Sequence, residues 1–188
     1  MATRYQVRLK NLAGVQVGLI TDWRSLTYTK RVNSVDDYTL VIDGELSLVD
    51  DFVLDGQIEI LRTDIAAVPV IPSTVDLEAF HRTAVRETNV DGLSTFTSKG
   101  LGYDDLLRRR AILFRAASSQ ADKSGVGETV MKAYVNENAG PGATSPPRLF
   151  AGVNTGLTIQ TDGAAGTSWE GEKSFRPLLS VLREITEA

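Results

Sequence analysis

The chain has 188 residues, of which 42% are hydrophobic, so it is long enough to bury one sizeable hydrophobic core or two small ones. Its formal net charge of −4 has the wrong sign for a protein that binds nucleic acid through clustered lysine and arginine, so DNA binding is not expected as its primary role. The absence of cysteine excludes disulfides, thiolate catalysis and cysteine-bound zinc. The longest apolar run, residues 65–72, is far shorter than the roughly 20 residues that a membrane-spanning helix needs.

From residue 5 to about residue 98 the sequence alternates apolar and polar side chains, with the period of two that is typical of β-strands. Clear examples are Tyr5, Val7, Leu9, Tyr38, Leu40 and Ile42. Turn residues divide this half into about six to eight short strands, and Asp91-Gly92 is a hairpin signal. The spacing predicts an antiparallel β-barrel-like domain over residues 1–100.

After Gly100 the period changes to that of helices. Asp104 and Asp105 stand at the front of a short predicted helix, and Arg108 and Arg109 stand at its end. This order suits the helix dipole, and it predicts that Asp104 pairs with Arg108 and Asp105 with Arg109 at i, i+4.

A longer amphipathic helix is predicted over residues 126–138, and Gly140-Pro141-Gly142 ends it, because glycine supplies a left-handed cap and proline cannot continue the helix. A short strand over residues 157–161 and a last helix follow, with Ser174 as the candidate cap of that helix. Its apolar face is formed by Phe175, Leu178, Leu179, Leu182 and Ile185. These elements predict a smaller α+β domain over residues 101–188 with two or three helices, and an α+β fold class for the whole chain.

The sequence contains no recognisable catalytic constellation. His81 is the only histidine, and one histidine without a cluster of cysteine or acidic residues beside it cannot complete a zinc site or a Ser-His-Asp triad, so a structural or surface role is predicted. The glycines at 100–102 and 125–127 lack the further residues of nucleotide-binding loops. No catalytic residue, cofactor or metal ion is predicted, and a loop calcium site at Asp50, Asp51 and Asp55 stays an alternative without EF-hand spacing.

Two features are candidates for contacts with other molecules. Arg108, Arg109 and Arg110 can bind an anionic partner, although arginines at a helix end are more often solvated or paired with nearby acids. Trp169 stands beside Glu170, and aromatic residues next to charges are enriched at interface cores. An ordinary core role is the alternative for Trp169.

The most distinctive segment of the sequence is Glu128–Pro141, a helix that ends in the phrase Tyr-Val-Asn-Glu-Asn-Ala-Gly-Pro. This segment resembles the tail-hub proteins of siphoviruses. Other segments similar to that family are Trp23–Tyr28, Tyr38–Ile42, Gly100–Arg110, Gly156–Ile159 and Leu178–Ile185. The similar segments follow one another in order and extend over most of the chain.

The resemblance implies a non-enzymatic structural role in a phage tail tip or baseplate. A hub subunit of this kind joins the tail tube to the tip and surrounds the DNA passage, in a homo-oligomer that is typically a trimer. The implied partners are the tail tube or distal tail protein and the tip or fibre proteins, without sequence-specific binding of nucleic acid. The implied location is the virion, assembled in the host cytoplasm.

Two alternative functions stay open. A distal-tail ring or adaptor protein would use the same kind of β domain, and six copies in a particle rather than three would indicate it. A tail-associated cell-wall hydrolase is the less favoured alternative, and clearing of cell walls in a zymogram would indicate it.

Overall fold

The computed structural model describes residues 3–65, 73–113, 121–144 and 157–188. The chain divides into two compact units, Met1–Asp104 and Asp105–Ala188. The first unit is one antiparallel sheet, and the second combines helices with a two-stranded ribbon. The β-rich, α+β character predicted from the sequence is therefore confirmed.

Seven strands form the sheet in the order β2-β1-β5-β6-β7-β4-β3, and every neighbouring pair is antiparallel. The strands are β1 (Thr3–Lys10), β2 (Gln16–Ile20), β3 (Ser25–Thr29), β4 (Asp37–Asp43), β5 (Gln57–Asp64), β6 (Thr74–Thr88) and β7 (Ser94–Gly102). A short 3₁₀ helix, η1 (Ser47–Asp51), lies between β4 and β5. Because β2 and β3 are the two edges, the sheet stays open.

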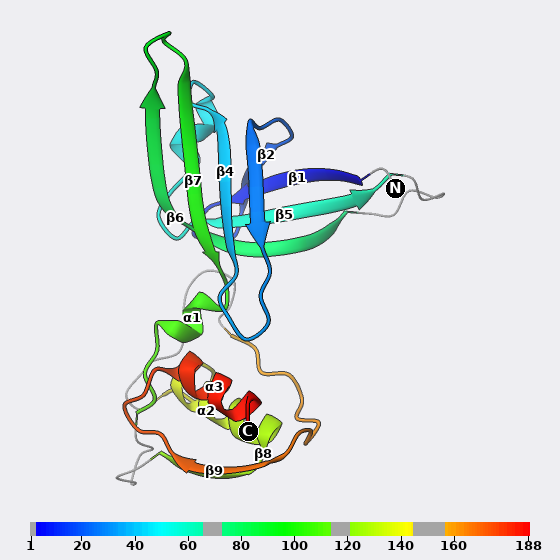
Figure 1. Cartoon of the computed structure of the whole chain (residues 1–188), viewed down its shortest axis with the longest axis vertical. Coiled ribbons are helices and arrows are strands. Elements are labelled where there is room, and N and C mark those ends of the chain that lie inside the picture. Colours follow the sequence, from blue (N-terminus) through cyan, green and yellow to red (C-terminus); the bar gives the residue numbers. More distant parts are fainter. Residues whose placement is uncertain (1–2, 66–72, 114–120, 145–156) are drawn as a thin grey trace. The chain divides into compact units, whose positions relative to one another are not determined.

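The long strand β6 makes the sheet curl. Its first part pairs with β5 and its second part with β7, and the register shifts once in each part. One shift lies between Ile60 and Leu61 of β5, and the other lies between His81 and Thr83 of β6. Such bulges bend a strand and increase its twist, and β6 accordingly changes direction along its length (Figure 1). The result is a curled half-barrel.

Alternate residues of the strands fill the inside of this curl, as the period of two requires. The buried cluster consists of Val7, Leu9, Ile20, Tyr38, Leu40, Ile42, Val49, Ile58, Ile60, Leu77, Ala79 and Phe96. Burying each large side chain of this kind contributes about 1.5–3 kcal/mol, so the cluster is the main source of stability in the first unit.

The second unit is built from α1 (Asp105–Arg108), β8 (Asp122–Val126), α2 (Gly127–Asn138), β9 (Ser168–Glu172) and α3 (Leu178–Thr186). β8 and β9 pair antiparallel, and α2 and α3 pack side by side above this ribbon (Figure 1). Its separate core consists of Ile112, Ala121, Val130, Tyr134, Ala139, Trp169, Leu178, Val181 and Ile185.

Three local predictions for this unit are wrong. Residues 157–161 are not a strand, because they find no strand to pair with among the described residues. Ser174 does not cap α3, which begins at Leu178; its Oγ instead accepts a hydrogen bond of 2.7 Å from the amide of Ala121. Phe175 therefore precedes the helix and is exposed, so it does not belong to the apolar face.

The distinctive phrase at the end of α2 has a structural explanation, since its polar residues hold neighbouring segments. The Tyr134 hydroxyl donates to the carbonyl of Ala121, and the Asn138 side chain accepts from the amide of Leu113. The Asn136 side chain accepts from the amide of Gly142, which fixes the turn after the helix. Residues that weaken a helix locally are thus used for contacts between segments.

Candidate functional site

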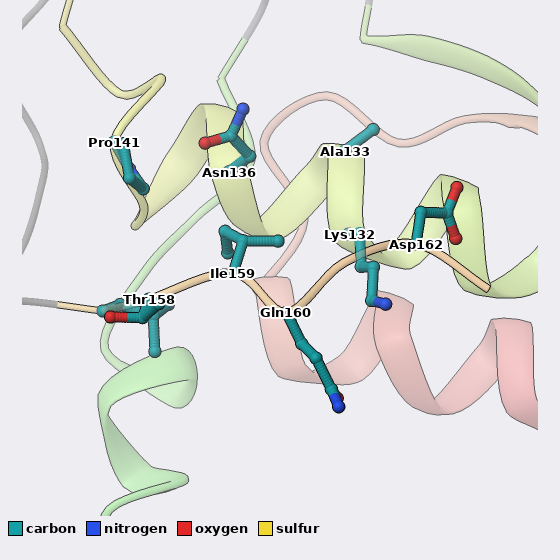
Figure 2. Close-up of a pocket in the computed structure, with 9 residues that line it drawn as sticks. Lys132, Ala133, Asn136, Pro141, Thr158, Ile159, Gln160 and Asp162 are labelled. Carbon is teal, nitrogen blue, oxygen red and sulfur yellow. The ribbon is translucent and has the colours of Figure 1, made fainter.

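An open groove in the second unit runs between α2 and the extended segment 157–162. Its volume is about 530 Å³. Figure 2 shows Thr158, Ile159 and Gln160 passing alongside the helix, with Ile159 toward it. An adjoining apolar recess of about 180 Å³ is lined mainly by Leu107, Met131, Val135, Leu157, Ile159 and Leu182.

The polar groups of this groove hold the extended segment in place. Lys132 Nζ donates to the carbonyl of Thr161 at 2.6 Å and to Glu128 Oε1 at 2.5 Å. The Thr129 hydroxyl donates to Asp162 Oδ2 at 2.6 Å. These groups therefore use their hydrogen bonds to fix the extended segment against α2.

Glu128 is the strongest of these anchors. Its two carboxylate oxygens accept from the backbone amides of Gly163 at 3.2 Å and Ala165 at 2.9 Å. The hydrogen bond from Lys132, followed by those two amides, lowers the pKa of Glu128 to about 2. The carboxylate is therefore ionised at neutral pH and serves as a structural clamp.

His81 lies in the core of the first unit with the geometry of a base next to a hydroxyl. Its Nδ1 is 2.7 Å from Ser98 Oγ, which is 2.8 Å from the Tyr38 hydroxyl. His81 is only 3% exposed and Ser98 is fully buried, so a substrate has no access to the pair. Burial lowers the pKa of His81, which keeps the imidazole neutral. This geometry gives His81 a structural role.

A second pocket, of about 480 Å³, is acidic and lies on the first unit. Asp36, Asp76, Glu78 and Asp104 line it together with Lys30, Val75, Leu77 and Tyr103. Asp76 accepts a hydrogen bond of 2.5 Å from the Tyr28 hydroxyl and lies 3.7 Å from Arg62 Nε. Across the described ranges, no group of three or more histidine, cysteine or acidic residues is placed to hold a metal ion. Asp50, Asp51 and Asp55, which lie outside this pocket, are likewise not grouped as calcium ligands.

The structure places the three predicted interface arginines at and just after α1. Arg109 pairs with Asp105 at 2.7 Å, as predicted, and Arg108 also pairs with Asp105, at 2.6 Å. Asp105 is only 1% exposed, so one buried carboxylate holds two arginines. Their role in binding a partner stays a prediction.

Trp169 is a core residue of the second unit. It is 8% exposed, and its ring packs edge-on against Tyr134 with the ring centroids 6.0 Å apart. The Nζ atom of Lys173 lies 5.7 Å from the Trp169 ring centroid. The alternative core role described from the sequence is the one that this geometry favours, and the predicted interface role has no further support.

Phe175, which was predicted to lie on the apolar face of the last helix, instead precedes that helix and exposes its ring. It is 65% exposed and has a φ of +63°, the left-handed region that bulky residues rarely adopt. The signal that could have located it is Pro177, because proline favours the first turn of a helix and so moves the helix start past Phe175.

No known family model and no curated protein matches this sequence. In the part of the chain that the structure describes, no helix is long and apolar enough to cross a membrane. The function has therefore to be argued from the residues and the surfaces.

Proposed function

We propose that this chain is a non-enzymatic structural subunit of a bacteriophage tail tip or baseplate, a hub subunit that joins the tail tube to the tip around the DNA passage. The observation that carries this proposal is the ordered series of segments that resemble siphovirus tail-hub proteins, above all Glu128–Pro141. The polar side chains of that segment hold neighbouring segments in place, which suits a passive building block.

Two further observations support a structural role. The His81 and Ser98 pair is sealed inside the core, and the groove of the second unit uses its charged groups to hold its own backbone.

The two compact units are proposed to be two domains of the subunit, a barrel-like domain and a smaller α+β domain. The subunit is proposed to assemble as a trimer in contact with the tail tube or distal tail protein and with tip or fibre proteins. A closed ring repeats one heterologous contact around an axis, so each subunit needs two different docking surfaces.

The test is to locate and count the chain in purified phage tails. Antibody labelling and a density map of the tail tip should place three copies around the DNA passage. Six copies would instead identify a distal-tail ring or adaptor. Absence from the tail, or cell-wall clearing by the purified chain in a zymogram, would overturn the proposal.

A further inference from the structure

One surface of the second unit combines arginines with an exposed aromatic ring. The segment after α1 and the segment before α3 lie side by side, because the amide of Phe175 donates to the carbonyl of Ile112 at 2.6 Å and the amide of Leu178 donates to that of Arg110 at 2.8 Å. Arg108, Arg109, Arg110, Phe175 and Arg176 are therefore neighbours, and we call them the arginine–phenylalanine patch. Arginine and aromatic residues are the types that dominate binding energy at protein interfaces.

The charge of this patch is strongly positive. Beside it, two carboxylates are shared by four cations: Asp105 pairs with Arg108 and Arg109, and Glu184 pairs with Lys173 and lies 3.9 Å from Arg176. Arg108 and Arg176 keep more than half of their side-chain surface exposed. An excess of positive charge therefore faces the solvent around the phenylalanine ring.

The backbone conformation of Phe175, with a φ of +63°, costs conformational free energy. A left-handed conformation at a bulky residue costs on the order of 1–2 kcal/mol, which glycine would avoid. Since most of the ring is in solvent, burial within the chain does not offset this cost. Burial against another molecule would offset it.

A surface of the first unit has the complementary chemistry. The connection from Asp43 to Gly56, which contains η1, has five acidic residues and no lysine or arginine, and we call it the acidic connection. Its large exposed apolar residues are Leu46, Val53 and Leu54. Among the described residues, Asp50 and Asp51 have no ion-pair partner, whereas Asp55 pairs with Arg82 and Glu45 with Arg86.

We propose that the arginine–phenylalanine patch of one copy binds the acidic connection of a second copy. Phe175 packs on the exposed leucine and valine side chains, while Arg108 and Arg176 face Asp50 and Asp51. The contact joins two different surfaces, so repeating it builds a ring or a chain of subunits. This contact would join neighbouring subunits of the proposed hub. Only its occurrence in a phage tail rests on the proposed function.

The first experiment reverses the charges on each surface and then mixes the variants. In Asp50→Arg/Asp51→Arg, the substituted positions of the acidic connection repel the arginines of the patch. In Arg108→Glu/Arg176→Glu, the substituted positions of the patch repel Asp50 and Asp51. Arg109 and Lys173 still pair with Asp105 and Glu184 in that second variant. In sedimentation at about 10–300 µM, the wild-type mass should rise above 20.4 kDa with concentration. Each variant alone should associate at least about tenfold more weakly, and an equimolar mixture should regain association.

The matched control is Glu170→Lys/Glu172→Lys, which changes as much charge at exposed positions of β9. It should associate like the wild type. A wild-type chain that stays monomeric throughout the range, a mixture that does not regain association, or a control that loses it equally would each overturn the inference. None of these outcomes bears on whether the chain is present in phage tails, so the two proposals fail separately.

The second experiment tests the ring. Phe175→Gly removes the side chain and the backbone strain together, so the melting temperature should stay the same or rise while association weakens at least about tenfold. Unchanged association would overturn the role of Phe175. The alternative hypothesis is that the patch binds DNA. Fluorescence anisotropy with a labelled single-stranded oligonucleotide should show no binding. Binding that Arg108→Glu/Arg176→Glu abolishes would overturn the inference.

Discussion

His81 gives the first unit a pH dependence that can be measured cleanly. Burial lowers its pKa, so the unfolded chain takes up a proton near pH 6.5 that the folded state does not bind. Its contribution to stability is fully present above that pH and falls as the pH drops toward the lower pKa of the folded state. Because His81 is the only histidine, no other side chain with an ordinary pKa in this range obscures the effect.

We expect urea unfolding between pH 8 and pH 5 to show stability falling below about pH 6.5, by at most about 1.4 kcal/mol per pH unit. In His81→Gln this slope should become shallower, because glutamine can still hydrogen-bond Ser98 but does not titrate. Equal slopes in the two proteins would contradict the assignment.

Glu59 is a buried carboxylate whose contribution to the stability of the fold depends on its ion-pair partners. It is 3% exposed and pairs with Arg8 at 2.8 Å and with Lys10. Glu59→Gln leaves two cations without their counter-ion, so we expect a loss of about 2–4 kcal/mol in urea unfolding. The control is Glu45→Gln, because its pair with Arg86 is exposed and should contribute about 0–1 kcal/mol. Equal losses would show that burial does not decide the contribution.

At the scale of elements, the extended segment 157–167 depends on α2 rather than on strand pairing. Glu128 accepts from the amides of Gly163 and Ala165, and its lowered pKa means that this contribution is present above about pH 4.5 and is lost as the pH falls toward 2. Glu128→Gln should increase hydrogen exchange at these two amides several-fold at pH 7. Glu137→Gln, on the same helix, should leave them unchanged; faster exchange in both variants would indicate general loosening of α2.

At the scale of the whole molecule, the buried apolar side chains of the described residues form two clusters that share no residue. Ile60→Ala in the first and Leu178→Ala in the second each remove a fully buried side chain, and each should cost about 2–5 kcal/mol. Because the two clusters share no residue, the losses in the double variant, summed over the unfolding of both units, should equal the sum of the single losses to within about 0.5 kcal/mol in denaturant unfolding. A larger deviation would mean that the two cores are energetically coupled.

What could be predicted from the sequence is what depends on residues close together along the chain. The period of two placed Val7, Leu9, Leu40 and Ile42 in a core, because side chains on a strand alternate between its faces wherever the strand lies. The end of α2 at Asn138, just before Gly140-Pro141, was predictable in the same way, but the predicted left-handed glycine cap is wrong, because neither Gly140 nor Gly142 has a positive φ.

Only the tertiary structure decided how the strands and helices pack together and which contacts their side chains make. The bulges in β6 curl the sheet, and they depend on pairing with strands distant in sequence. Ser174 bonds to Ala121 rather than capping a helix, and Phe175 is exposed, because segments brought together by folding compete with local preferences. The burial of Ser98 beside His81, which closes off the one histidine, likewise follows from packing that no local spacing encodes.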